Sequence, residues 1–147
     1  MSLYATFRLG GLQFGLDLMQ VREINRILDI TPVPHARAHI RGLINLRGQI
    51  VTIIDLRVRL GLERQDLPGT GHNIILKPGP HRDGRAAGEL AGLLVDAIGD
   101  VVEADPAAVE PPAANVCETE ARFLAGVLNT GSGLVVLLDL NEVLQGE

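Results

Sequence analysis

The sequence has 147 residues, enough for one domain or for two small halves that share a core. Its hydrophobic fraction of 46% argues against a disordered chain, and its apolar runs fall far short of the about 20 residues that span a bilayer. The net charge of −5 divides into +4 over residues 1–77 and −9 over residues 78–147, a dipole that suits a charged protein partner and disfavours nucleic acid.

The first third of the chain predicts a hairpin followed by less regular structure. Residues 3–9 and 12–18 alternate apolar and polar side chains on either side of the tight turn Gly10-Gly11. Residues 19–24 are compatible with one helical turn, and residues 24–33 predict a further strand that ends at a proline pair.

The middle of the chain predicts a complete strand–turn–strand–helix unit. One short helical turn is expected over residues 35–42, and then GLINLR and QIVTIIDL form two strands joined at Gly48. The second strand is apolar at nearly every position, which is typical of a strand buried on both faces. Asp55 is the expected cap of a short helix that Gly61 ends.

The second half of the chain predicts more strands and one terminal helix. The expected strands lie in residues 73–77, 89–105, 123–130 and 133–140, and the helix in residues 141–147. Loops are expected over residues 63–72, 78–88 and 106–123.

Two internal repeats organise these elements. Residues 42–61 align without a gap on residues 126–145, at an offset of 84, and FGLDLMQVREI from Phe14 aligns more weakly on AGLLVDAIGDV from Ala91, at an offset of 77. We therefore predict a mostly β fold of two five-stranded barrels with short helices and swapped or packed edges. Residues 1–147 form one domain, with strands of about 3–62 mainly in its first half and those of 72–147 mainly in its second. An interleaving of the two subdomains stays open.

Motifs for catalysis or cofactor binding are missing from the sequence. It has no nucleotide-binding glycine loop, no nucleophile elbow and no HExxH motif. His35 and His39 are four residues apart but lack further ligands nearby, and the lone Cys117 allows neither an internal disulfide nor a cysteine metal cluster. We expect no enzyme activity, no metal and no cofactor. The N-terminus lacks the features of a signal peptide, so we expect a soluble, cytoplasmic protein without membrane insertion.

Arg47 is the residue that needs an explanation, because it lies between two apolar strands beside Gly48. An arginine there must be paired or solvated. In the structural interpretation it bonds an acid or backbone carbonyls and holds the turn, with Glu23 as the candidate mate. In the functional interpretation its planar guanidinium is offered to a partner. The second copy of the repeat has Gly131-Ser132 at this point, so the arginine is not required by the repeat itself.

Taken together, several segments resemble the CheW family, the coupling proteins of bacterial chemosensory arrays. They are FGLDLMQVREI, TPVPHARAHIRGLINLRGQIVTIIDLRVRLGL, GLLVDAIGDVVEAD and FLAGVLNTGSGLVVLLDLNEVL, which together cover nearly the full length. The resemblance implies one CheW-like domain of two SH3-like barrels. It also implies a non-catalytic adaptor that couples the cytoplasmic helical tip of chemoreceptors to the regulatory domain of a CheA-type histidine kinase.

The resemblance also implies site residues. The receptor-facing groove is expected at Val21, Glu23, Gly42, Asn45 and Arg47, and an apolar groove for a receptor helix adds Leu46. Kinase contact is expected from the barrel ends, at Gly92, Leu94 and Ile98. Two alternatives stay open: a CheW-like scaffold of a non-flagellar pathway such as surface or pilus motility, or a small binding module with an unrelated signalling role.

Overall fold

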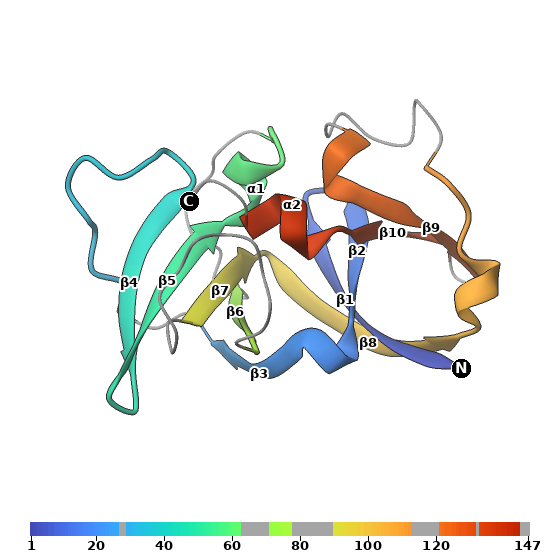
Figure 1. Cartoon of the computed structure of the whole chain (residues 1–147), viewed down its shortest axis with the longest axis horizontal. Coiled ribbons are helices and arrows are strands. Elements are labelled where there is room, and N and C mark those ends of the chain that lie inside the picture. The colour runs from blue at the N-terminus through green and yellow to red at the C-terminus, as the bar shows by residue number, and fades with distance from the viewer. Residues whose placement is uncertain (27–28, 63–70, 78–89, 113–120, 132, 145–147) are drawn as a thin grey trace.

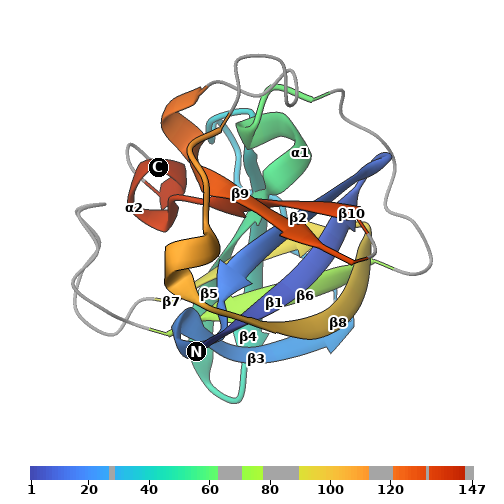
Figure 2. The same ribbon diagram turned by 90° about the vertical axis from the view of Figure 1, so that its right-hand side faces the viewer.

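The fold is mostly β, with two five-stranded sheets side by side and short helices between them (Figures 1 and 2). A computed structural model describes residues 1–26, 29–62, 71–77, 90–112, 121–131 and 133–144. The strands are β1 (Ser2–Leu9), β2 (Leu12–Asp17), β3 (Val21–Arg26), β4 (Ile40–Leu46), β5 (Gln49–Asp55), β6 (His72–Leu76), β7 (Leu90–Val95), β8 (Ala97–Ala104), β9 (Leu124–Thr130) and β10 (Gly133–Leu138). The α-helices are α1 (Leu56–Arg59) and α2 (Leu140–Leu144).

The two sheets exchange strands between the halves of the chain. Sheet A has the order β8-β1-β2-β10-β9, and sheet B has the order β3-β6-β7-β5-β4. The first hairpin, β1–β2, therefore completes the sheet of β8, β9 and β10, whereas β6–β7 complete the sheet of β3, β4 and β5. Each sheet thus takes three strands from one half of the chain and two from the other.

The exchange unites the two sequence repeats in one pattern. Adding 84 to the bounds of β4 gives residues 124–130, those of β9, and the same offset brings β5 and α1 onto β10 and α2. The weaker offset of 77 brings β2 and β3 onto β7 and β8. In each sheet one strand of the exchanged hairpin pairs in parallel with its host, β2 with β10 and β7 with β5. The other strand pairs antiparallel, β1 with β8 and β6 with β3. The sequence repeat is therefore a structural repeat.

Three apolar clusters fill the part of the molecule that the structure describes. One lies inside sheet B and includes Val51 and Ile53, a smaller one lies inside sheet A, and the largest fills the space between the sheets. Ile54 belongs to this central cluster although Val51 and Ile53 face the interior of sheet B. From Val51 onward, β5 thus buries residues on both faces, as its apolar sequence predicts.

Each of the two α-helices begins at an aspartate whose side chain caps its first turn. The side chain of Asp55 accepts a hydrogen bond from Val58 N, and that of Asp139 accepts from Asn141 N and Glu142 N. These caps satisfy amide groups that the first helical turn leaves free. The chain leaves α1 at Gly61, whose φ of +84° suits a glycine that ends a helix.

The segments around β3 differ from their prediction. The helical turn expected over residues 19–24 lies earlier, at Leu18–Gln20, and is capped by Asp17. The strand begins at Val21, because residues 21–26 pair with β6. The strand expected over residues 24–33 is interrupted at residues 29 and 30, and within residues 29–33 only Thr31 forms a bridge, to Leu43 on the edge of β4. Residues 35–42 hold turns and the start of β4 rather than a helical turn.

Some predicted features lie outside the described residues. They are Cys117, the whole loop expected over residues 78–88, and parts of the segments expected over residues 63–72, 106–123 and 141–147. None of the helices in the described ranges has the length and hydrophobicity that a membrane crossing requires.

Candidate partner-binding site

The hairpin turn between β4 and β5 presents Arg47. Leu46 pairs with Gln49, and the two central residues have positive φ values, 51° for Arg47 and 86° for Gly48. This is the pattern of a type I′ turn, whose twist matches that of the flanking strands. Asn45 Oδ1 accepts a hydrogen bond from Gly48 N at 2.9 Å and braces the turn. A left-handed backbone conformation costs a residue other than glycine about 1–2 kcal/mol, so Arg47 occupies this turn position at an energetic cost.

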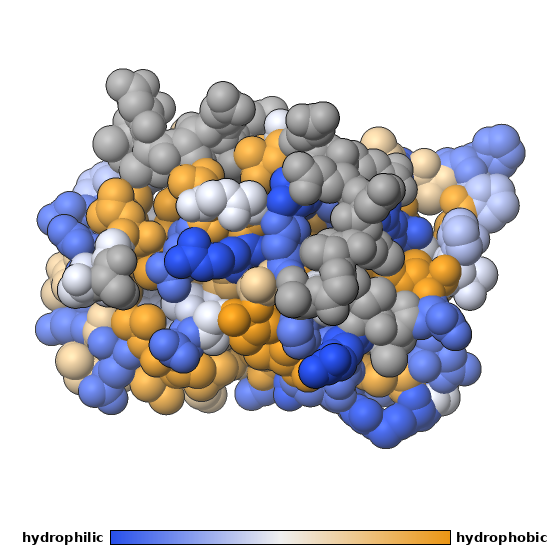
Figure 3. Space-filling model, turned by 180° about the vertical axis from the view of Figure 1, so that it is seen from behind, coloured by the Kyte–Doolittle hydropathy of each residue, from blue (hydrophilic) through white to orange (hydrophobic). Residues whose placement is uncertain are grey.

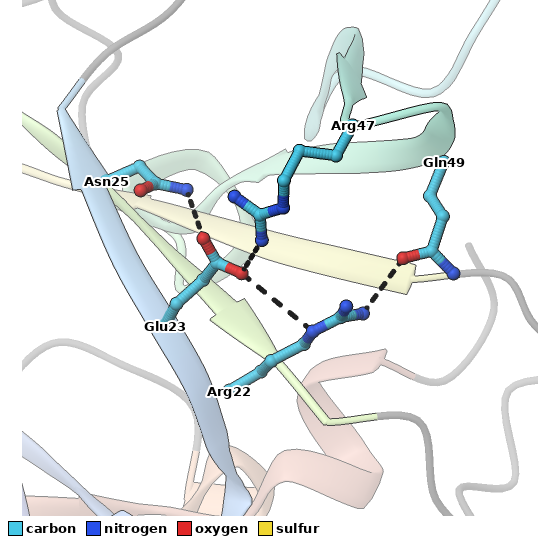
Figure 4. A network of polar contacts seen from close by, with 5 residues as sticks. All are labelled: Arg22, Glu23, Asn25, Arg47 and Gln49. Carbon is cyan, nitrogen blue, oxygen red and sulfur yellow. Dashed lines mark hydrogen bonds and ion pairs between the residues drawn. The ribbon is translucent and has the colours of Figure 1, made fainter.

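A polar network joins this turn to β3 (Figure 4). Arg47 forms an ion pair with Glu23, whose other carboxylate oxygen accepts a hydrogen bond from Asn25 Nδ2 at 3.1 Å. Arg22 donates to Gln49 Oε1 at 3.0 Å. Because β3 and β4 are the two end strands of sheet B, these side chains link the ends of the sheet across a gap that no ladder of backbone hydrogen bonds spans. We name this group, Arg22, Glu23, Asn25, Arg47 and Gln49, the edge network.

The edge network keeps Glu23 charged and leaves Arg47 exposed to solvent. The hydrogen bond from Arg47, helped by that from Asn25, lowers the pKa of Glu23 below its ordinary value near 4.5. The carboxylate is therefore charged at neutral pH. The Arg47 side chain remains 64% exposed, against 23% for Glu23. The guanidinium can thus hold the acid with one edge and offer its remaining N–H groups to a partner.

Gly42 and Asn45, by contrast, have roles that the fold explains. A Cβ on Gly42 would lie 2.7 Å from Ile30 Cγ2 and closer still to the carbonyl oxygen of Thr31. Gly126, its counterpart in the repeat, is crowded in the same way by Val109 and Glu110. Both glycines admit a neighbouring segment that bridges to the edge of β4 or of β9. Asn45 also recurs, as Asn129, so neither residue distinguishes one sheet from the other.

Val21 and Leu46 do not form an exposed apolar groove. Val21 packs in the central cluster and Leu46 inside sheet B, and both are buried. The exposed apolar side chains of sheet B are instead Ile24, which is 38% exposed on β3, and Ile50, which is 53% exposed on β5. Viewed from behind, apolar and hydrophilic residues are interspersed on the surface (Figure 3). Ile24 lies on the face of β3 that also carries Arg22 and Arg26, which could have indicated its exposure. The sequence of β5, apolar at nearly every position, gives no such signal for Ile50.

The residues expected to contact a kinase lie mostly inside the molecule. A Cβ on Gly92 would lie 2.9 Å from Ile53 Cδ1 and 3.0 Å from Ile75 Cδ1, within the interior of sheet B. Leu94 is 5% exposed in the same cluster. Ile98 is half-buried against the central cluster. Gly92 and Leu94 therefore offer no side chain to a partner in this conformation.

His35 and His39, which are four residues apart in the sequence, do not share an environment in the structure. His35 is exposed, whereas His39 is buried, and its Nε2 has no hydrogen-bond partner among the residues that the structure describes. Within the described ranges no three His, Cys, Asp or Glu side chains gather as a metal site would need.

The comparisons with known proteins agree with this architecture. The family model described as a CheW-like domain matches residues 3–147. The chain belongs to the CheW family. It is 33% identical over 141 residues to the chemotaxis protein CheW of Rhizobium meliloti (strain 1021), covering 96% of this chain and 86% of that protein. It is 27% identical over 144 residues to the chemotaxis protein CheW of Klebsiella aerogenes, covering 98% of this chain and 82% of that protein.

A solved CheW structure has the same fold. The scaffolding protein TtCheW from Thermoanaerobacter tengcongensis superposes with a TM-score of 0.82 at 30% sequence identity, over 97% of this chain and 86% of that one. The two five-stranded sheets are thus the paired SH3-like barrels of the CheW fold, as the resemblance implied.

Proposed function

We propose that the chain is a non-catalytic, cytoplasmic adaptor of bacterial chemosensory signalling. It joins the cytoplasmic helical tip of a chemoreceptor to the regulatory domain of a CheA-type histidine kinase. Membership of the CheW family supports this role, as do relatives named chemotaxis proteins and a structural neighbour titled a scaffolding protein. The adaptor acts by holding partners in place, so its chemistry is that of surfaces rather than of a reacting group.

The observation that carries the receptor site is the exposed ion pair of Arg47 with Glu23. The two repeats share the turn asparagine and the crowded glycine, but Gly131 stands where Arg47 would recur. The pair is therefore a local addition to sheet B that the repeated fold does not require. An exposed arginine on a sheet that also exposes Ile24 and Ile50 suits an amphipathic helix that carries both acidic and apolar residues.

Binding of a soluble receptor-tip fragment tests the proposal. The purified chain should bind the fragment and a CheA-type kinase together, with micromolar individual affinities that the assembled array strengthens by avidity. Arg47→Glu should weaken receptor binding by at least about tenfold, because the variant offers like charge to an acidic partner. A variant that folds normally and still forms the ternary complex would remove Arg47 from the site.

The double variant Glu23→Arg/Arg47→Glu separates the two interpretations of Arg47. It retains an ion pair between β3 and the turn but reverses the charges offered to a partner. If the pair only closes the sheet, the double variant recovers receptor binding. If Arg47 contacts the receptor, binding stays lost although the free energy of unfolding recovers. The proposal expects the second outcome.

A further inference from the structure

The chain passes from one sheet to the other at two places. Between β2 and β3 it crosses through the 3-10 turn Leu18–Gln20, and between β7 and β8 it crosses through one residue, Asp96. A one-residue crossing leaves few backbone torsions to set the angle between the sheets. Side-chain contacts at Asp96 therefore bear directly on that angle.

Asp96 is held from both sheets at once. Arg57 on α1, which continues β5 of sheet B, forms a two-pronged ion pair with it, and the Nε–Oδ1 distance is 2.9 Å. Oδ2 also accepts a hydrogen bond from Gly10 N, at 2.8 Å, in the turn between β1 and β2 of sheet A. The Asp96 amide donates to the carbonyl of Arg8 at 3.0 Å. A fork-to-fork arginine pair fixes direction as well as distance.

A second arginine of α1, Arg59, also contacts elements that belong with sheet A. Arg59 Nε donates to the carbonyl of Val143 at 2.8 Å, and Nη2 donates to that of Glu142 at 3.1 Å. These carbonyls lie in α2, which follows β10 of sheet A. The Arg59 guanidinium also lies 5.1 Å from the ring centre of Phe123. The short helix α1 thus sends two cations from sheet B to elements of sheet A.

We call these contacts of Arg57 and Arg59 across the two sheets the clasp. The repeat shows that the clasp is not needed to form the helix. Leu56 and Leu60 recur as Leu140 and Leu144, and all four leucines are buried. Arg57 and Arg59 instead correspond to Asn141 and Val143. The shared leucines anchor each helix to its core, whereas the arginines belong to one copy and point to the other half of the molecule.

We infer that Arg57 and Asp96 are positioning residues that set the angle between the two barrels. This inference rests on the proposed function in one respect: an adaptor that binds two large partners must present both surfaces at one fixed angle. Loss of the clasp then leaves binding to each partner alone intact but prevents both partners from binding in the correct relative orientation. The clasp thus couples the orientation of the edge network on sheet B to the orientation of the surfaces of sheet A.

The angle is measured directly by spin-label distances in the free protein. Labels on cysteines placed at exposed Ile50 and Leu134, in a Cys117→Ser background, report one site in each sheet. Arg57→Ala should broaden the distance distribution. Arg41→Ala is the matched control, because Arg41 pairs with Asp55 inside sheet B and its side chain is 13% exposed, as is that of Arg57. The control should leave the distribution as narrow as in the parent.

Signalling supplies the second readout, which a merely stabilising role would not move. Arg57→Ala should keep its affinity for the receptor-tip fragment alone and for the kinase alone within about twofold, yet lower kinase activation in the ternary complex about tenfold. Arg57→Lys, which keeps the charge but not the fork, should fall between. Arg41→Ala should activate the kinase like the parent.

Each outcome decides the inference. A distribution as narrow for Arg57→Ala as for the parent, or full ternary activation, overturns it. If Arg57→Ala does not fold, Asp96→Asn serves instead, because its amide oxygen still accepts from Gly10 N while the ion pair is lost. If the parent chain binds neither partner, the proposed function fails, but the distance measurement still decides whether Arg57 sets the angle.

Discussion

Gly15 on β2 lies directly opposite Leu137 on β10, in the parallel pair that joins the exchanged hairpin to sheet A. A Cβ on Gly15 would come within 3.0 Å of Leu137 Cδ2 and 2.8 Å of Val135 Cγ1. Gly92 faces Ile53 in the equivalent pair of sheet B. Each exchanged hairpin therefore packs a bare backbone position against aliphatic side chains of its host, which lets the two strands approach with the core filled.

Gly15→Ala should lower the free energy of unfolding by about 1–3 kcal/mol, because the added methyl group overpacks the interior of sheet A. Urea unfolding followed by circular dichroism measures the change. Gly11→Ala is the control, since nothing lies within 4 Å of a Cβ there, and its effect should stay within about 0.5 kcal/mol. Equal effects of the two substitutions would show that the parallel pair relaxes to admit the methyl group.

Gly42→Ala should be more severe, about 3 kcal/mol, because two costs add. Its φ of +149° is a region that L side chains rarely adopt, and the methyl group would displace Thr31 from its bridge to Leu43. Gly48→Ala isolates the first cost: its φ is +86° with open space around it, so about 1 kcal/mol is expected. Any loss of receptor binding by Gly42→Ala should then follow its loss of stability. Weak binding by a fully stable Gly42→Ala protein would instead make Gly42 a contact residue.

The repeat explains how much of the fold the sequence predicts. The gapless offset of 84 places β4, β5 and α1 on β9, β10 and α2, and the aliphatic strand and its Asp cap are visible in both copies. The exchange of hairpins is not visible in this way. Alternation of apolar residues says which face of β2 is buried, but it does not say whether β10 or β5 lies beside that strand. Non-local parallel pairing is decided by the packing of whole sheets.

The candidate site was predicted in the same partial way. The pairing of Arg47 with Glu23 is confirmed, and the Arg47 side chain is also 64% exposed to solvent. Arg22, Asn25 and Gln49 were missed, because their contribution depends on β3 and β4 being the two ends of one sheet. Val21, which the resemblance places in the groove, and Leu46, which its hydrophobicity adds, are both buried in apolar clusters. Hydrophobicity predicts burial more readily than it predicts a docking surface.

Glu23→Gln should destabilise the protein at neutral pH, with an effect that fades in acid. The pKa of Glu23 is lowered in the folded state, chiefly by Arg47, so its contribution is complete above the ordinary value near 4.5 and is lost as the pH falls through the folded value. Urea midpoints of the parent and the variant, measured from pH 7 to pH 3, should therefore converge below about pH 4.5. A difference that stays constant over this range would mean that the Arg47 pair makes no net contribution through the charge of Glu23.

His39 should give the protein a second pH dependence, at higher pH. Burial lowers the pKa of His39 below its ordinary value of 6.5, with help from the charges of Arg59 and Arg37, so the folded state favours the neutral ring. The contribution of the neutral His39 ring to the free energy of unfolding is then fully present above pH 6.5. It declines as the pH falls toward the folded pKa, because the unfolded chain takes up the proton first.

The variant His39→Leu removes both the titration and a buried nitrogen without a hydrogen bond among the described residues. The variant should match or exceed the parent in stability at pH 7 and lose the decline between pH 6.5 and pH 5. Arg37→Gln should keep most of the decline, because burial is the larger cause. A parent whose urea midpoint is flat over this range would show that the His39 ring takes up its proton without cost in the folded state.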